Sequence, residues 1–267
     1  MPSLEYRNMV VPTFLENWPH ELEQLSIAQV DVPLTLEEAE AIGTNIIELF
    51  ELFPEPHFRN IRDIVGRLDT AVRKFPNGAF VRLGSRSPKD SLHGYTHGFR
   101  VTDGVQAMKL LLGVSERISD DLQAALEWKY EPHIFVREWV IIPQWAELRC
   151  FMNGRKLVGI SQYNYMSGHL EFLDKNVTPI RFAVEQFFDR FKVASHLDTV
   201  VFDVFVKHRC LDNVHDWSVK LLEINPFCEF TDPCLFSWKK PEQFDGSFLV
   251  CKEGTNGTNF SKYTGPL

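Results

Sequence analysis

The sequence lacks the cysteine pattern of a disulfide or zinc framework. Its 267 residues include only five cysteines, at positions 150, 210, 228, 234 and 251, and no two of them form a Cys-x-x-Cys pair. An odd number of scattered cysteines favours free thiols in a reducing compartment. The first ten residues show no secretory signal, and no apolar run approaches the roughly 20 residues of a membrane helix. We therefore expect a cytoplasmic protein with no membrane partner.

Several short motifs of enzymes are also missing. The chain has no Gly-x-x-x-x-Gly-Lys-Ser/Thr phosphate loop, no Gly-x-Gly-x-x-Gly after a strand and no Gly-x-Ser-x-Gly elbow. His93 and His97 are four residues apart, but no Glu follows His93 as in a helical zinc motif. The net charge of −8 argues against nucleic acid as a partner, because non-specific binding needs a cationic surface. An anionic ligand can still bind in a local basic cleft.

The residues that are present indicate a globular protein with an aromatic core. Apolar residues make up 44% of the chain and charged residues 24%, and there are 22 phenylalanines. Thr35 and Glu38 have the spacing of a capping box, which predicts a helix over 35–53. A second apolar stripe predicts a helix over 58–74. We therefore expect residues 1–75 to form a helical N-terminal region.

The rest of the chain mixes strands and helices. Strands are predicted over 78–84, 133–142, 147–152, 156–163, 199–206 and 217–224, and helices over 103–112, 119–128 and 177–194. Asn153-Gly154 is expected to form a hairpin turn, residues 85–104 a long loop, and residues 251–267 a loosely ordered polar tail. This order of elements favours an α+β fold over a doubly wound sheet.

A group of oxygen-bearing side chains lies on two of the predicted strands. Asp203 interrupts an apolar strand, where a carboxylate is costly unless it is paired or bound to a cation. Glu223 and Asn225 are two residues apart, hence on one face, at the end of another strand just before Pro226. If these strands pair, the three side chains form a cluster suited to Mg²⁺. The alternative is that Asp203 accepts hydrogen bonds from backbone groups or from an arginine.

Two further groups of charged residues could bind an anion. Glu147 and Arg149 share a strand face, and an arginine can hold phosphate oxygens with two parallel bonds. Arg82, Arg86 and Lys89 gather around the end of the strand 78–84. Read singly, the first group could be a Glu–Arg surface pair and the second a solvated basic loop.

The order of these groups resembles the ATP-grasp fold, and more closely the cell division cycle protein 123 (D123) family. The resemblance runs from residue 80 to residue 238 in the family's order, over the stretches VRLGSRSPKD, MKLLLGVSERISDDL, VREWVIIPQWAELRCFMNGRKLVGISQ, VFDVFV and VKLLEINPFCEFTDPCLFSW. ISQ and TDPCLFSW are not general ATP-grasp features, which makes the match specific.

The resemblance implies two α+β lobes with ATP between them. The smaller lobe would span 76–142 and the larger lobe 143–250. Arg82, Arg86 and Lys89 would bind the nucleotide with Glu147 and Arg149, and Arg82 and Arg149 would stabilise phosphoryl charge in any catalysis. The adenine hinge would comprise Glu138, Trp139, Val140 and Ile141, and Mg²⁺ would bind to Asp203, Glu223 and Asn225.

Several departures from the family pattern stand out. Arg82 occupies a position where lysine is usual, and Glu223 one where eukaryotic members tend to have aspartate. Tyr163-Asn164-Tyr165 follows ISQ where Arg-Asp-Tyr is common, which removes one cation and one anion near the implied cleft. The acidic insert and long C-terminal extension of eukaryotic members are also missing.

The sequence is compatible with three functions. By the resemblance, the chain would be an ATP-dependent assembly or binding factor, because eukaryotic relatives engage the gamma subunit of translation initiation factor 2; a GTPase-like counterpart could replace that partner. The alternative is an ATP-grasp ligase that joins a carboxylate to an amine through an acyl phosphate. A third possibility is a degenerate fold that binds no nucleotide, against which the joint presence of Arg149, Asp203, Glu223 and Asn225 argues.

Overall fold

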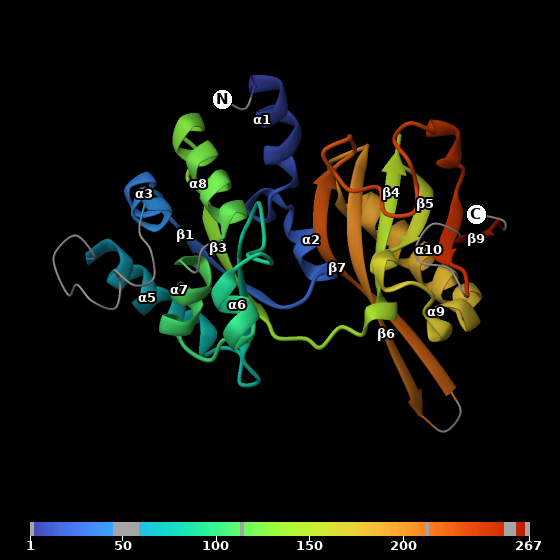
Figure 1. Cartoon of the computed structure of the whole chain (residues 1–267), viewed down its shortest axis with the longest axis horizontal. Helices are drawn as coiled ribbons and strands as arrows, with labels where there is room; N and C mark the ends of the chain where they lie inside the picture. Colours follow the sequence, from blue (N-terminus) through green and yellow to red (C-terminus); the bar gives the residue numbers. More distant parts are fainter. Residues whose placement is uncertain (1–2, 45–58, 113–114, 212–213, 254–259, 265–267) are drawn as a thin grey trace. The chain divides into compact units, whose positions relative to one another are not determined.

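The computed structural model describes residues 3–44, 59–112, 115–211, 214–253 and 260–264 (Figure 1). The chain forms two compact units. The first consists of residues 1–17 and 28–140, and the second of residues 18–27 and 141–267. Among the described residues, no helix is both long and apolar enough to cross a bilayer.

The first unit is built on a three-stranded antiparallel sheet. Its strands lie in the order β1 (Gln29–Pro33), β3 (His133–Glu138) and β2 (Ala79–Leu83). Helices α3 (Leu36–Thr44), α5 (Arg59–Val72), α7 (Gly104–Leu112) and α8 (Glu116–Trp128) share one apolar core with this sheet. The helices α1 (Leu4–Val10) and α6 (Leu92–His97) complete the unit.

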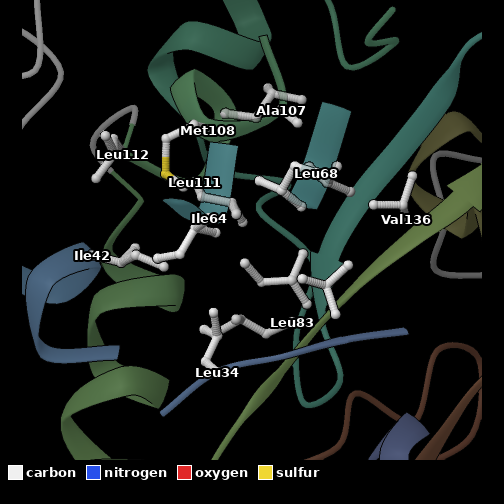
Figure 2. Packing of buried hydrophobic residues seen from close by; sticks show 14 of the residues in the cluster. Leu34, Ile42, Ile64, Leu68, Leu83, Ala107, Met108, Leu111, Leu112 and Val136 are labelled. Atoms are coloured by element: carbon white, nitrogen blue, oxygen red, sulfur yellow. The ribbon is translucent and has the colours of Figure 1, made fainter. Parts of the chain in front are cut away.

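The core of the first unit follows from strand alternation and helical spacing. Val81 of β2 and Val136 of β3 belong to one buried cluster with Leu68 of α5 and Met108 of α7, and Figure 2 labels Leu68, Met108 and Val136 within it. All four are at most 1% exposed, so the sheet face toward these helices is fully covered.

The second unit contains a six-stranded sheet. Its order is β7 (Val214–Pro226), β6 (Val200–Leu211), β4 (Glu147–Asn153), β5 (Lys156–Gln162), β8 (Ser247–Cys251) and β9 (Phe260–Tyr263). All neighbours are antiparallel except β5 and β8. Helices α2 (His20–Leu25) and α9 (Glu171–Lys175) also belong to this unit.

One face of the six-stranded sheet packs on α10 (Val177–Ala194). Phe202 of β6 stacks on Phe191 of this helix with ring centroids 4.2 Å apart, and Phe188 also stacks on it at 6.2 Å. The opposite face carries Phe151 and Val201 in a second apolar cluster. Alternate residues of β6 therefore pack against α10 or against the second apolar cluster. Asp203 lies on the same face as Val201.

Most of the expected elements are confirmed. The capping box is present, with the Thr35 backbone N–H donating to Glu38 Oε2 at 3.0 Å and the Glu38 N–H donating to Thr35 Oγ1 at 3.2 Å. The helix expected over 177–194 spans those residues. The part of the helix 35–53 beyond Thr44 lies outside the described residues.

Other expectations were wrong in detail. The expected loop 85–104 contains α6, whose first turn is capped by Ser91. The turn between β4 and β5 places Gly154 and Arg155, not Asn153 and Gly154, at its centre, because these two residues have φ of 55° and 61° and Asn153 still pairs with Lys156. The polar tail includes β9, which pairs with β8.

The division of the chain also differs from the expected one. Residues 1–75 are not a separate helical region, because β1 pairs with β3 and belongs to the sheet of the first unit. Residues 18–27 belong to the second unit instead. The rest of the second unit runs from Ile141 to Leu267, so no boundary falls at residue 250.

Candidate functional site

Three charged residues form a row across the sheet of the second unit. Arg149 of β4 lies opposite Asp203 of β6, and Asp203 lies opposite Glu223 of β7. Side chains of directly opposed residues project from the same face at about 5 Å spacing. The expected proximity of Asp203 and Glu223 is therefore confirmed, and Arg149 joins them.

A β-bulge in β7 produces this alignment. Asp203 pairs with Glu223, but the next residue of β6, Val204, pairs with Leu221, so Leu222 is an extra residue in the ladder. In a strictly alternating strand, Leu221 and Glu223 would project from the same face. The bulge instead leaves Leu221 opposite Val204 and brings Glu223 to the face of Asp203, which is how bulges re-aim side chains near functional sites.

Arg149 and Asp203 form a buried ion pair. Arg149 Nε donates to Asp203 Oδ1 at 2.8 Å, and Arg149 Nη2 donates to Asp203 Oδ2 at 2.7 Å. The two side chains are only 6% and 3% exposed. Burial alone would lower the pKa of Arg149, but the Asp203 carboxylate raises it above its ordinary value. The guanidinium therefore stays charged.

Two other groups hold the Arg149 guanidinium. Nη1 donates to the backbone carbonyl of Asp232 at 2.7 Å, and the Tyr163 ring lies with its centroid 5.0 Å from Cζ. A cation over an aromatic face at this distance is attracted by the ring. Neither contact involves Asp203, so the guanidinium is positioned by three separate groups: the Asp203 carboxylate, the Asp232 carbonyl and the Tyr163 ring.

The segment that follows β7 is tied to the site by hydrogen bonds. Asp232 Oδ1 accepts the Cys234 backbone N–H at 2.8 Å, and the Leu235 N–H donates to Ser161 Oγ of β5 at 3.2 Å.

Burial raises the pKa of the Cys234 thiol, and the same holds for Cys150 in β4. Both thiols therefore stay protonated near neutral pH and are poor nucleophiles or metal ligands.

Glu223 and Asn225 are half-buried, and Glu223 follows the Arg149–Asp203 pair in the row across the sheet. Asn225 Nδ2 donates to Glu223 Oε1 at 2.9 Å, so the two side chains lie on one face as expected. Both side chains carry oxygen atoms of the kind that bind a hard cation. Within the described residues, no group of three or more His, Cys, Asp or Glu side chains is placed so that it could hold a metal ion. Any cation here would have two carboxylates and one amide.

The other expected residue on β4, Glu147, has the same side-chain parity as Arg149 and is half-buried. Its opposite residue on β6 is Phe205, and its role in binding the nucleotide with Arg149 stays a prediction. The contact with Asp232 could not be predicted, because every residue has a backbone carbonyl and no residue type signals its use. Tyr163 stood out only as a departure from the family pattern.

The basic residues of the first unit have separate surroundings. Arg82 of β2 is buried, and its Nε donates to the Leu83 carbonyl at 2.9 Å. Arg86 Nε lies 3.1 Å from Asp121 Oδ1 of α8, an acid whose pKa burial raises. Lys89 is exposed. Arg86 is thus held by an ion pair within this unit, and the binding of an anion by Arg82, Arg86 and Lys89 stays a prediction.

Residues 138–141 link the two units in sequence. Glu138 ends β3 and its N–H donates to the Ala28 carbonyl at 2.8 Å, while the Trp139 N–H donates to the Gly78 carbonyl at 3.1 Å. Val140 is the last residue of the first unit. The first unit also has an open groove of about 650 Å³ between β1 and α5, which none of the expected site residues lines.

Comparisons with known proteins point to one family. The family model described as D123 matches residues 37–256. A translation initiation factor eIF2 assembly protein of Candida albicans is 25% identical over 195 residues, which cover 68% of this chain and 54% of that protein. Cell division cycle protein 123 of Phaeosphaeria nodorum is 34% identical over 188 residues, covering 66% and 47%. The chain spans about half the length of the curated relatives it matches.

A solved structure shares the fold. The structure of Cdc123 from Schizosaccharomyces pombe superposes with a TM-score of 0.72, at 21% sequence identity, over 90% of this chain and 93% of that one. This similarity confirms the expected α+β fold.

Proposed function

Since the chain belongs to the D123 family, we propose that it is a Mg-ATP-binding factor that assists the assembly of translation initiation factor 2. Two relatives of this chain, from Candida albicans and Schizosaccharomyces pombe, are named as assembly proteins of that factor. The observation that carries the nucleotide part is the row of Arg149, Asp203 and Glu223, which puts an anion-binding group beside two carboxylates. The gamma subunit is the partner we propose within that factor.

The residues at the site fit a magnesium ion. Mg²⁺ prefers oxygen ligands and is usually held in proteins by one or two carboxylates together with water and substrate phosphates. Asp203 and Glu223 supply the carboxylates, and Asn225 supplies an amide whose nitrogen is already turned toward Glu223. When bound, the ion would neutralise phosphate charge.

The remaining residues would bind the nucleotide. Arg149 offers a planar set of donors, and the Tyr163 ring and Asp232 carbonyl orient it. In the first unit, Arg82 and Lys89 would add positive charge toward phosphates, and residues 138–141 would contact adenine. Bound ATP would then favour one arrangement of the chain for the partner to recognise.

Calorimetry tests the nucleotide part directly. ATP would be titrated into the wild-type protein with Mg²⁺ and with EDTA, and into Asp203→Asn and Asp198→Asn. Asp198 is a matched control, because its exposed carboxylate only pairs with Arg155 on the surface of the same unit. We expect Mg²⁺-dependent binding in the wild type and in Asp198→Asn, and its loss in Asp203→Asn.

A binding assay with the purified gamma subunit tests the partner. Retention that increases with Mg-ATP and falls in Asp203→Asn supports the assembly role. ATP consumption by the isolated protein, stimulated by a carboxylic acid and an amine, would instead identify a ligase. No binding to the gamma subunit in either nucleotide state would overturn the proposed partner.

A further inference from the structure

Arg149 and Asp203 satisfy each other in this structure. Both Asp203 oxygens accept from the guanidinium, at 2.8 and 2.7 Å, and both side chains are almost fully buried. In such surroundings water screens charge weakly, so each residue strongly reduces the net charge that a third group experiences. The pair is therefore less attractive to any ion than either member alone.

This pairing weakens the binding of a cation. A divalent ion that approaches Asp203 meets a carboxylate already neutralised by a guanidinium at hydrogen-bond distance. Glu223 lies on the other side of Asp203 in the row, so a cation would bind on that side, away from Arg149. The affinity of Asp203 and Glu223 for a cation then depends on how strongly Arg149 remains paired with Asp203.

The pairing also weakens the binding of an anion. A guanidinium has five N–H donors, and Arg149 uses three of them on Asp203 and on the Asp232 carbonyl. A phosphate that takes both terminal nitrogens of Arg149 must compete with Asp203. The contacts with Asp232 and Tyr163 do not involve Asp203, so they can keep the guanidinium in place when its bonds to Asp203 weaken.

We propose that the Arg149–Asp203 pair is a latch that makes cation binding at Asp203 and Glu223 depend on an anion at Arg149. This inference rests on the proposed function, because it takes the triphosphate of ATP as the anion. An anion that draws Arg149 away restores the full charge of Asp203, which then binds the cation. By thermodynamic linkage, the cation strengthens anion binding by the same factor. The latch keeps the site from filling with metal alone.

The first test uses a metal without nucleotide, so that direct metal–phosphate bonds cannot contribute. Mn²⁺ would be titrated into the wild type, Arg149→Met and Arg155→Met, and free Mn²⁺ followed by electron paramagnetic resonance. We expect Arg149→Met to bind Mn²⁺ at least tenfold more tightly than the wild type. Arg155→Met should match the wild type, because Arg155 pairs with Asp198 at the surface. Equal affinities in all three proteins overturn the latch.

The second test examines the anion side and serves if Arg149→Met does not fold. ATP would be titrated in EDTA into the wild type, Asp203→Asn and Asp198→Asn. Loss of the Asp203 charge frees Arg149, so we expect Asp203→Asn to bind metal-free ATP at least threefold more tightly than the wild type. Unchanged or weaker binding, with Asp198→Asn equal to the wild type, overturns the latch.

The two tests separate the latch from the proposed function. A wild-type protein that binds no ATP, with or without Mg²⁺, contradicts the proposed function, yet the Mn²⁺ titration still decides the latch. Conversely, tight Mg-ATP binding together with tight Mn²⁺ binding to the wild type supports the proposed function and overturns the latch.

Discussion

Arg149 and Asp203 lie directly opposite each other on neighbouring antiparallel strands and share two hydrogen bonds in a buried setting. Of the two interpretations open for Asp203, a cation ligand and an arginine partner, the second is what the structure contains. The two are compatible, because each carboxylate oxygen can accept more than one contact. The pair thus links the stability of the second unit to its proposed chemistry.

Asp203→Asn should weaken Mg²⁺-dependent ATP binding by at least tenfold, or about 1.4 kcal/mol. The substitution keeps the shape of the side chain but removes the charge that a cation needs. Calorimetric titration in Mg²⁺ measures the change, with Asp198→Asn as the control. A folded variant with wild-type affinity would show that Asp203 does not bind the metal.

Arg149→Met should lower the free energy of unfolding by about 3–5 kcal/mol, because it leaves a buried carboxylate without its partner. The double variant Arg149→Met, Asp203→Leu should recover much of that loss, since no buried charge remains. Denaturation in urea compares the double variant with Arg149→Met and with Asp203→Leu alone. If the double variant is as unstable as the sum of both single variants, the two residues are not coupled.

Tyr163→Leu should destabilise the protein by about 0.5–2 kcal/mol relative to Tyr163→Phe, because only the phenyl ring preserves the cation–π contact with Arg149. Thermal unfolding of both variants measures this difference. Equal melting temperatures would mean that the ring contributes nothing through Arg149.

Phe202→Ala should cost about 3–5 kcal/mol, because it opens a cavity among the stacked rings of α10. Phe182→Ala on the same helix is the control, as its side chain is 62% exposed. We expect the control to change the free energy of unfolding by less than about 1 kcal/mol. A small effect at Phe202 would contradict the packing described for this face.

Glu16→Gln should make the first unit more stable at neutral pH than the wild type. Burial raises the pKa of Glu16, whose Oε1 accepts the Tyr130 hydroxyl at 2.9 Å. Its side chain also lies where a Cβ on Gly84 would meet Oε2 at 1.5 Å. A carboxyl whose pKa is raised on folding stabilises the protein at acidic pH, and this contribution is lost as the pH rises through the raised pKa.

Melting temperatures of the wild type and Glu16→Gln, recorded from acidic to neutral pH, check this prediction. The two curves should be close at low pH and separate as the pH rises, with Glu16→Gln above the wild type. Parallel curves would show that Glu16 titrates as an ordinary exposed carboxyl.

Much of the fold could be predicted from periodicity and local motifs. The helix 177–194 and the capping box at Thr35 are encoded by residues close in sequence. Strands β1, β8 and β9 were missed because each is short, and only their partners in the sheet make them strands. The α+β class was right because it depends on the order of elements.

The candidate site could be predicted only in part. Asp203 was conspicuous because a carboxylate in an apolar strand requires a partner, but the sequence could not choose between a cation and Arg149. The pairing of Arg149 with Asp203 depends on strand order, which sets β4 beside β6 although more than 50 residues separate them. The contact with the Asp232 carbonyl depends on a loop path that no residue type signals.

The extra residue in β7 has a consequence for any comparison of sequences in this region. Leu221 and Ile224 are three residues apart, yet both pair with residues of β6 that face α10. Glu223 and Asn225 pair with residues on the other face of β6. A relative with one residue fewer at this point would carry its carboxylate in the same place with a regular ladder. If the two sequences were aligned without a gap from the β6–β7 turn onward, that carboxylate would align with Leu222. The relative would then seem to lack the acid, although its carboxylate and Glu223 occupy the same place in the fold.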